Sequence, residues 1–506
     1  MDMALEITKQ TIEVETCAGS ASAQTLARAE TLVPGAGREA IEVLLAEAEV
    51  SVLSAQAQAG RIVAEAEVRT QAAYRQGDET APRALSARTG LSRTFEIEGV
   101  EPQMAAEVCA RVEHVEAKYE NGRMVFLVTV DMTARATGLR SVEVLTGVTG
   151  LEDVQQDLRE ICSEKTAAQT KATTLLREEV PLPAAMDART SLMDWGGVWV
   201  EKWEPDLGGV RVRGRVSAES LLSTGSGDRP AVAVKHQLEF DQLVEVPEWL
   251  CSRVCAAATL RKLESRVDQA ERGEDGVLTI EAEVEICVDS LATDCATALF
   301  DAYAAGSENL KVERAPVQYC GALRCERCLS QVKGTLMLEE GAPGVGSVVC
   351  ALGNPNISGW ATNGESAVEG VVEISVLYQT TEGALASAQG EIPFRVECPG
   401  ALNDTSLVCV EVQSLEAGAL MSDRVDLRCV VGVTARTRRE ETALLATGVE
   451  EGAPEKKRPG IVLFWPTSSD SVWSIGQRYR IPVEEVRTLN GGTDTIEPGR
   501  AMVIRI

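Results

Sequence analysis

The chain has 506 residues, enough for several domains, and its 77 acidic residues against 49 basic ones give a formal net charge of −28. This charge excludes nucleic acid as a partner, because phosphates require Lys and Arg, and it argues against direct binding to an anionic membrane surface. The first 15 residues have no apolar signal-peptide core, and no apolar run reaches transmembrane length. We therefore expect no direct membrane insertion and a cytoplasmic protein.

Three copies of one strand pattern occupy the chain up to residue 439, with a period of about 150 residues. Each copy opens on a proline-containing segment and continues with a strand in which apolar and polar residues alternate. Such alternation is typical of antiparallel sheets with one buried face. A second strand follows around Phe95, Phe240 and Phe394, and another long alternating strand closes each copy. The proline-containing segments are 31–34, 180–183 and 340–343. Many short strands with Gly-rich turns predict a sandwich in each copy.

Two segments interrupt this strand pattern. Leu158, Ile161 and Cys162, with charges around them, predict a helical connector at 151–179. Residues 440–460 have the polar, Gly- and Pro-containing composition of a flexible linker. The predicted domains are therefore module 1 at 1–150, the connector at 151–179, module 2 at 180–318, module 3 at 319–439, the linker at 440–460 and a last unit at 461–506.

The last unit changes character. A β-branched and aromatic run at 461–465 predicts a strand, and Asp470 can cap a following helix by accepting backbone N–H bonds. Pro482 opens a second helix, Asn490 and the two glycines after it end that helix, and residues 502–506 predict a closing strand. The predicted fold class is mainly β: three repeated antiparallel, sandwich-like modules followed by a small α+β domain of strand, helix, helix and strand.

Residues 461–506 resemble a LysM domain. The matching stretches are DSVWSI at 470–475, YRIPVEEV at 479–486, LN at 489–490 and IEPG at 496–499. The resemblance implies a groove between two loops, here 468–471 and 490–496, which in LysM domains takes N-acetylglucosamine polymers. Ser469 stands where the family usually has Gly, so a side chain intrudes where backbone would approach a sugar. The candidate residues for binding a partner or a glycan are Ser468, Ser469, Asp470, Ser471, Trp473, Asn490, Gly491, Thr493 and Ile496.

The rest of the chain carries a second resemblance. The stretch MALEITKQTIEVET at 3–16, the VPLP motif at 180–183 and the repeated strand pattern resemble SPOCS domains of spore-coat-associated proteins. SPOCS repeats followed by one LysM domain resemble the SipL-type coat morphogenesis family. In that family the LysM domain docks on the coat morphogenetic ATPase, stage IV sporulation protein A, at the forespore surface.

Three functions follow from these resemblances. The first is a non-enzymatic scaffold for spore coat assembly, located in the mother-cell cytoplasm at the forespore surface with the morphogenetic ATPase as its partner. The second is a protein that binds peptidoglycan or another N-acetylglucosamine polymer through the same groove. The third is a wall hydrolase that a LysM domain targets, which requires a paired-carboxylate, Cys-His or zinc site.

Catalytic motifs are missing from the sequence. His114 and His236 lie in charged surroundings without a nucleophile elbow, and neither a Walker A motif nor a dinucleotide-binding motif stands in a strand–helix setting. We therefore expect no enzyme and no cofactor.

The chain has 14 cysteines, and without a secretion signal reduced thiols are the expected state. Cys320, Cys325 and Cys328 have a spacing that can bind zinc, with a fourth ligand such as Cys295 or Cys350. A redox pair is a second option, because Arg324 and Arg327 would lower thiol pKa values. The favoured interpretation is a reduced segment without metal.

Overall fold

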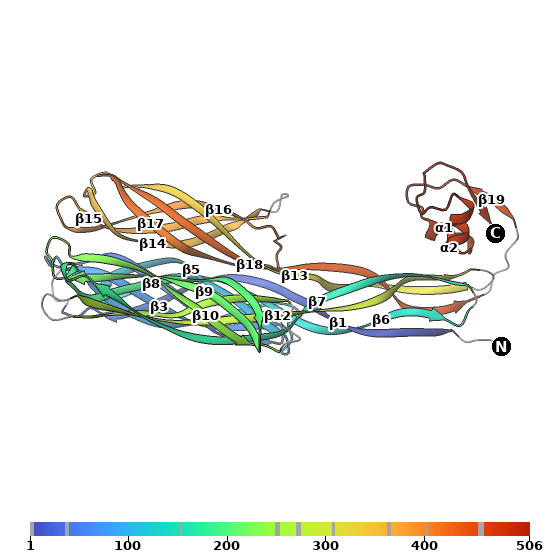
Figure 1. Ribbon diagram of the computed structural model, residues 1–506, viewed down its shortest axis with the longest axis horizontal. Helices are drawn as coiled ribbons and strands as arrows, with labels where there is room; N and C mark the ends of the chain where they lie inside the picture. The colour runs from blue at the N-terminus through green and yellow to red at the C-terminus, as the bar shows by residue number, and fades with distance from the viewer. Residues whose placement is uncertain are drawn as a thin grey trace.

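The computed structural model describes residues 5–35, 40–151, 153–247, 253–269, 275–305, 309–361, 366–400, 402–453 and 460–506. Within them the chain forms three repeated pairs of small antiparallel sheets and then a strand-helix-helix-strand unit, so the predicted fold class is confirmed. The sandwiches of the three modules gather at one end of an elongated molecule, and the last unit lies at the other end (Figure 1).

Each module has six strands. Module 1 consists of β1 (Glu6–Leu32), β2 (Ile41–Gln58), β3 (Arg61–Gln76), β4 (Arg83–Glu96), β5 (Ala105–Glu120) and β6 (Arg123–Thr149). Module 2 consists of β7 (Val154–Leu182), the short 3-10 helix Ala184–Met186, β8 (Ala188–Asp206), β9 (Gly209–Thr224), β10 (Ala231–Glu245), β11 (Val254–Asp268) and β12 (Gly276–Ala304). Module 3 consists of β13 (Asn309–Met337), β14 (Val345–Ala361), β15 (Ala367–Thr380), β16 (Leu385–Glu397), β17 (Leu407–Met421) and β18 (Arg424–Gly452).

The two sheets of a module follow one plan. The second, third and fourth strands form a meander, and the sixth strand lies between the first and the fifth in the other sheet. Apolar residues at alternate positions of the middle strands, such as Ile62, Ala64 and Val68 of β3, are fully buried between the sheets. Phe95, Phe240 and Phe394 lie in the corresponding strands β4, β10 and β16, the last strand of each meander, and all three are buried. The predicted repeat is therefore confirmed.

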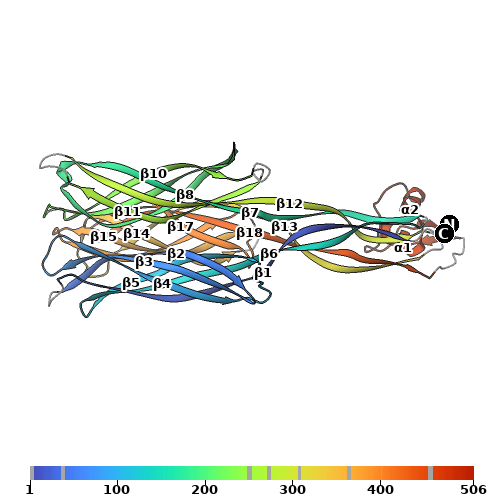
Figure 2. The same cartoon turned by 90° about the horizontal axis from the view of Figure 1, so that it is seen from below.

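The first and last strands of each module are 27 or 29 residues long, against a typical strand of about 5–6 residues. They run past the end of the fifth strand as two-stranded ribbons, and the three ribbons together form what we call the stalk (Figures 1 and 2). The stalk consists of 6–16 with 138–149, 154–166 with 291–304, and 309–324 with 437–452. A register shift lies close to where each ribbon leaves its sandwich, as between Cys17 and Gly19 or between Ser290 and Leu291, and such bulges bend and twist a strand.

Apolar contacts among all three modules hold the ribbons and the sandwiches together. Inside the stalk, Ile12 and Val144 of module 1 pack with Ile161 of module 2 and Leu445 of module 3. At the opposite end, the meanders share a second cluster. Its buried members are Leu44, Leu45, Ala73, Met193, Trp195, Leu221, Ala231, Cys350, Leu352, Leu377 and Leu385. Burial at both ends makes the three modules one packed body.

Two carboxylates, one buried and one half-buried, link successive modules where the stalk begins. Glu15 of β1 accepts the backbone N–H of Thr166 in β7 and pairs with Arg438 of β18, so this one side chain contacts all three modules. Glu164 of β7 accepts the backbone N–H of Leu323 in β13 at 2.6 Å. At each of these contacts between modules, a charged carboxylate accepts a backbone N–H. Such charge-assisted hydrogen bonds are stronger than those between neutral groups.

The predicted helical connector at 151–179 is wrong. From Val154 onward these residues form β7, and from Thr166 to Arg177 their exposure alternates with the period of two that a strand requires. The apolar spacing of Leu158, Ile161 and Cys162 suggested a helix, but pairing with β12 along its whole length decides the structure. Tertiary pairing has overridden a weak local pattern.

The module boundaries shift for the same reason. Module 2 begins at Val154 rather than at 180, and module 3 spans 309–452 rather than 319–439, because the first long strand of each module precedes its proline-containing segment. The predicted linker at 440–460 is wrong for residues 440–452, which belong to β18 and pair with β13. Residues 454–459 lie outside the described part of the chain.

Candidate functional site

The unit at the end of the chain has the predicted order of elements. It consists of β19 (Ile461–Phe464), α1 (Val472–Tyr479), α2 (Val483–Leu489) and β20 (Met502–Arg505), and β19 pairs antiparallel with β20. Its core joins both helices to the sheet through Val472, Ile475, Ile481, Val486 and Ile504, all of which are buried.

The sequence predicted Asp470 as the cap of the first helix, but Asp470 does not cap it. Ser471 is the N-cap: its hydroxyl accepts the Ser474 N–H at 3.0 Å, and the Ser474 hydroxyl accepts the Ser471 N–H at 2.8 Å. Asp470 instead accepts the backbone N–H and the hydroxyl of Thr467, both at 2.8 Å. These hydrogen bonds, with a smaller effect of Arg478, lower the pKa of the Asp470 carboxyl. Asp470 therefore shapes the first loop.

Asn490 fastens the second helix to the closing strand. Its amide donates to the Val486 carbonyl and to the Val503 carbonyl, both at 2.8 Å, and its carbonyl accepts the Val503 N–H at 2.7 Å. Gly491 and Gly492 follow with φ values of 97° and 75°, a region that favours glycine. The predicted end of the helix is confirmed, and the polar groups of Asn490 are engaged within the unit.

The two predicted loops leave the unit at the same end. Phe464 at the end of β19 pairs with Met502 at the start of β20, and the Gly499 N–H donates to the Pro466 carbonyl at 2.9 Å. The loop at 468–471 follows β19, and the loop at 490–496 precedes β20. Ser468, Ser469, Ser471, Gly491 and Thr493 are exposed, whereas Asp470 is half-buried and Ile496 packs against the core of the unit.

Trp473 does not lie free beside those loops, because it contacts the tip of the stalk. Its indole N–H donates to Asp301 of β12 at 3.1 Å, and the amide of Gln477 donates to the same carboxylate oxygen at 3.1 Å. Trp473 also packs edge-on against the Tyr303 ring, with 5.0 Å between ring centroids. Arg314 of β13 balances the charge of Asp301 from the other side, at 3.3 Å.

Further contacts hold the unit on the stalk. The Tyr303 hydroxyl donates to the Ile481 carbonyl at 2.9 Å, and the Val483 N–H donates to Gln155 at 3.3 Å. Burial and the nearby Asp301 raise the pKa of Tyr303, so the hydroxyl keeps its proton and remains a donor. Gly476 lies so close to Tyr303 that a Cβ would stand 2.4 Å from the hydroxyl oxygen. We call these contacts the stalk–helix interface, and the helices face the stalk in Figure 1.

The opposite face of the unit carries an apolar surface that the sequence analysis missed. Ile461, Leu463 and Trp465 alternate along β19 and the residue after it, and they are 76%, 56% and 57% exposed. Val503 pairs with Leu463 and extends this surface onto β20. We call these four residues the outer sheet face. The period-two alternation from Ile461 was the available signal, because a strand with one buried face exposes every second residue.

The predicted zinc candidates do not converge. Cys320 is buried beside Leu323, whereas Cys325 contacts the thiol of Cys255 in module 2 and Cys328 contacts that of Cys398. Among the described residues, Glu160, Cys162 and Cys295 have possible ligand atoms close enough together to hold a metal ion. Two of these three residues, Cys162 and Cys295, form a disulfide. Cys350, the other suggested fourth ligand, is buried among the meanders. The structure therefore does not bring the suggested zinc ligands together.

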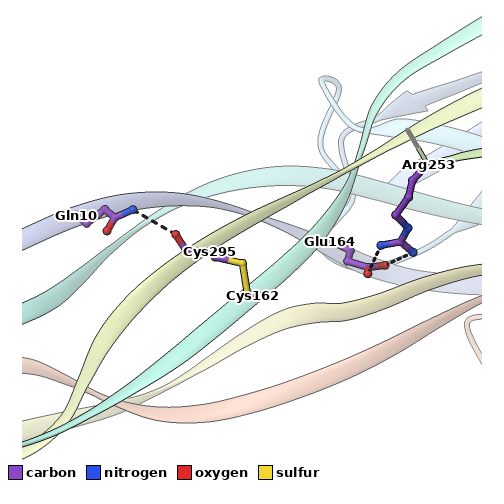
Figure 3. The surroundings of a disulfide bond; sticks show 5 residues. All are labelled: Gln10, Cys162, Glu164, Arg253 and Cys295. Carbon is purple, nitrogen blue, oxygen red and sulfur yellow. Dashed lines mark hydrogen bonds and ion pairs between the residues drawn. A yellow bond between two sulfur atoms is a disulfide. The ribbon is translucent and has the colours of Figure 1, made fainter. Parts of the chain in front are cut away.

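The expectation that every thiol is reduced is wrong at one pair. Cys162 of β7 and Cys295 of β12 form a disulfide in the module 2 part of the stalk (Figure 3). The two residues are direct cross-strand partners, so pairing of β7 with β12 brings their side chains together. Local sequence could not show this pairing, because 133 positions separate the two cysteines.

A cavity of about 1200 Å³ lies among the three modules, between the stalk and the cluster formed by the meanders. Each module contributes a largely buried acid to its wall: Glu47 from β2, Glu219 from β9 and Glu411 from β17. Burial raises the pKa of all three, to about 7 for Glu219 and for Glu411. Lys235 lies 3.3 Å from Glu219 and offsets part of this effect.

These raised pKa values predict a pH dependence of stability. The folded protein holds protons that the unfolded chain releases above its pKa of 4.5, so the free energy of unfolding falls as pH rises from 4.5 to about 7. Glu219→Gln and Glu411→Gln should each remove up to about 3 kcal/mol of this fall. Urea unfolding across that pH range measures it, with Glu416→Gln, an exposed carboxylate on the same strand as Glu411, as control. Equal slopes in the wild type and both variants would contradict the assignment.

Comparison with known families identifies two segments. Residues 39–120 match the family described as SipL, SPOCS domain, and residues 467–505 match the LysM domain. The chain contains a SipL-type SPOCS domain and a C-terminal LysM domain. The SPOCS match covers β2 to β5 of module 1, and the LysM match covers both predicted loops, both helices and β20. Neither the curated proteins nor the solved structures give a match.

The two domain types are binding and structural modules, and the SPOCS match places the chain in the context of sporulation and the spore coat. Within the described residues, no helix has the length and apolar character needed to cross a bilayer. In the LysM unit, the two loops expose hydroxyl groups at Ser468, Ser469, Ser471 and Thr493, and the outer sheet face exposes apolar side chains, all of which are suited to binding.

Proposed function

We propose that the protein is a non-enzymatic scaffold of spore coat assembly whose LysM domain recruits it to the coat morphogenetic ATPase at the forespore surface. The observation that carries this proposal is the combination of a SipL-type SPOCS domain with a C-terminal LysM domain in one chain. The three modules supply a long, packed body, and the LysM domain is held at its far tip (Figure 1). A recruiting domain at the tip leaves the sandwiches free to contact other coat components.

The outer sheet face supports a protein as the partner. Its four apolar residues lie on the side of the LysM domain away from the helices, so the stalk–helix interface leaves them accessible. Large apolar residues are seldom clustered on a surface unless a partner covers them. Trp465 in particular offers a large ring, the kind of side chain that dominates protein interfaces.

Peptidoglycan, or another N-acetylglucosamine polymer, is the second candidate. The exposed loops at 468–471 and 490–496 favour it, since both leave the same end of the domain. Three features count against it: Ser469 stands in place of glycine, Asn490 is fully engaged, and Trp473 contacts the stalk.

One binding experiment distinguishes the two candidates. The full-length chain is tested against the purified morphogenetic ATPase and, in parallel, by sedimentation with purified peptidoglycan. We expect binding to the ATPase that Leu463→Asp weakens by tenfold or more, about 1.4 kcal/mol or more, because a charge then stands in an apolar interface. Thr488→Ala, at an exposed position of α2 outside both loops and the outer sheet face, serves as control. Sedimentation with peptidoglycan that soluble chitin fragments reverse, without ATPase binding, would favour the second candidate.

A further inference from the structure

Four cysteines on strands of different modules form two thiol pairs. Cys109 of β5 in module 1 contacts Cys409 of β17 in module 3, and Cys255 of β11 in module 2 contacts Cys325 of β13 in module 3. None of the four belongs to the disulfide of module 2. Module 3 is thus connected by one thiol pair to module 1 and by another to module 2.

The Cys109–Cys409 pair lies on the wall of the cavity among the modules. The Cys109 sulfur is 3.9 Å from the carbonyl oxygen of Val408, the residue just before Cys409, so the two strands lie side by side at this point. Both cysteines line this cavity, whose volume of about 1200 Å³ is large enough to hold a molecule the size of a peroxide beside the two sulfurs.

The Cys255–Cys325 pair is held by contacts on both sides of each cysteine. Arg253 donates to the Leu323 carbonyl at 3.4 Å, and Arg327 donates to the Ala256 carbonyl. These contacts place the two strands in a fixed register at the pair. Trp203 and Trp199 lie 4.9 Å and 5.6 Å from the Arg327 guanidinium, measured to the ring centroids, and hold that side chain in place.

We propose that these two thiol pairs are oxidative modification sites, at which a hydroperoxide forms disulfides that cross-link module 3 to module 1 and to module 2. The inference is independent of the proposed function, because it concerns the packing of the modules rather than the LysM domain. Oxidation would convert three modules held by non-covalent contacts into a covalently closed body.

One cysteine of each pair is suited to start the reaction. The contact with the Cys325 thiol, together with Arg436 and Arg253, lowers the pKa of Cys255 to about 7, so a large fraction is thiolate near neutral pH. The contact with the Cys409 thiol likewise lowers the pKa of Cys109. In each pair the lower-pKa thiolate is the nucleophile and its partner is the resolving thiol.

The chemistry balances with one peroxide for each pair. The thiolate attacks one peroxide oxygen, a sulfur–oxygen bond forms, the oxygen–oxygen bond breaks, and hydroxide leaves and takes up a proton as water. The resolving thiol then attacks the sulfenic sulfur, forms the sulfur–sulfur bond, and releases the second oxygen as water. Two thiols and one hydrogen peroxide thus give one disulfide and two waters.

Other described cysteines provide comparisons. Cys328 and Cys398 also contact each other, but both belong to module 3, so their oxidation would not connect modules. Cys17 is half-buried, and its close partners are a backbone carbonyl and charged groups rather than a thiol. Cys17 therefore serves as the matched control.

Peptide mapping of the full-length chain tests the proposal. The protein is reduced, freed of reductant, treated with hydrogen peroxide while folded, blocked with a thiol reagent, and digested without reduction. We expect linked peptides that join Cys109 to Cys409 and Cys255 to Cys325, each lighter by two hydrogen atoms than its separate thiol peptides. We also expect loss of thiol labelling at these four cysteines, while labelling of Cys17 persists.

Two variants and a denatured sample complete the experiment. Cys409→Ser should abolish the first link and leave the second, Cys325→Ser should do the reverse, and Cys17→Ser should change neither. Protein oxidised in urea should lose the selectivity for these partners. The proposal is overturned if the folded wild type yields neither inter-module link, or if the same links form with equal yield in urea.

Discussion

Replacing Arg438 with Ala is expected to lower the free energy of unfolding of the three-module body by about 3–5 kcal/mol. The Arg438 and Glu15 side chains are only 3% and 4% exposed, and they pair across modules 3 and 1 where the stalk begins. The variant leaves the Glu15 charge buried without its ion-pair partner, although Thr166 N–H still donates to it. Urea unfolding followed by circular dichroism measures the change.

Two further variants separate this effect from simple loss of a surface charge. Arg123→Ala breaks an exposed pair between β6 and Glu30 of β1, within module 1, and it should cost at most about 1 kcal/mol. Combining Arg438→Met with Glu15→Leu removes both charges and should restore much of the lost stability. A loss for Arg438→Ala no greater than that for Arg123→Ala would show that the buried pair does not hold the modules together.

The second large effect concerns the stalk–helix interface. Asp301→Ala removes the carboxylate that accepts from both Trp473 and Gln477, and hydrogen bonds to charged groups contribute about 1.5–3 kcal/mol each. We expect the LysM domain to leave the stalk in a population at least roughly tenfold larger than in the wild type. Hydrogen exchange of the α1 amides reports this release.

A control and a second variant make the test specific. Glu450→Gln changes an exposed carboxylate on the stalk and should leave exchange in α1 unchanged. Tyr303→Phe removes the hydrogen bond to the Ile481 carbonyl while keeping the ring against Trp473, so its effect should be smaller than that of Asp301→Ala. Unchanged α1 exchange in Asp301→Ala would mean that the interface does not hold the domain.

The sequence was informative wherever the pattern of a single strand or helix decides the outcome. The alternation in β3, β9 and β15 and the three phenylalanines at 95, 240 and 394 revealed the repeat, because burial between two sheets imposes a period of two. The LysM elements followed from local signals, such as Pro482 at the start of a helix and the glycines after Asn490 at its end.

Prediction from the sequence failed where a segment distant in the chain decides the local structure. Residues 154–179 became a strand because β12 pairs with them along their whole length, and the stalk exists only because three such ribbons bury one another's apolar faces. For the same reason, the disulfide of Cys162 and the contact of Trp473 with Asp301 could not be predicted. Among the site residues, Asn490 and Asp470 proved to be engaged in shaping the LysM domain, and the outer sheet face was overlooked.

The most direct test of the proposed recruitment is the position of fluorescent fusions in sporulating cells. The full-length chain should form a ring at the forespore surface, and a chain that ends at Gly452 keeps all three modules but should spread through the mother cell. Leu463→Asp should spread in the same way, whereas Asp301→Ala, which frees the LysM domain without altering its outer sheet face, should still form the ring. A ring formed by the chain that ends at Gly452 would contradict recruitment through the LysM domain.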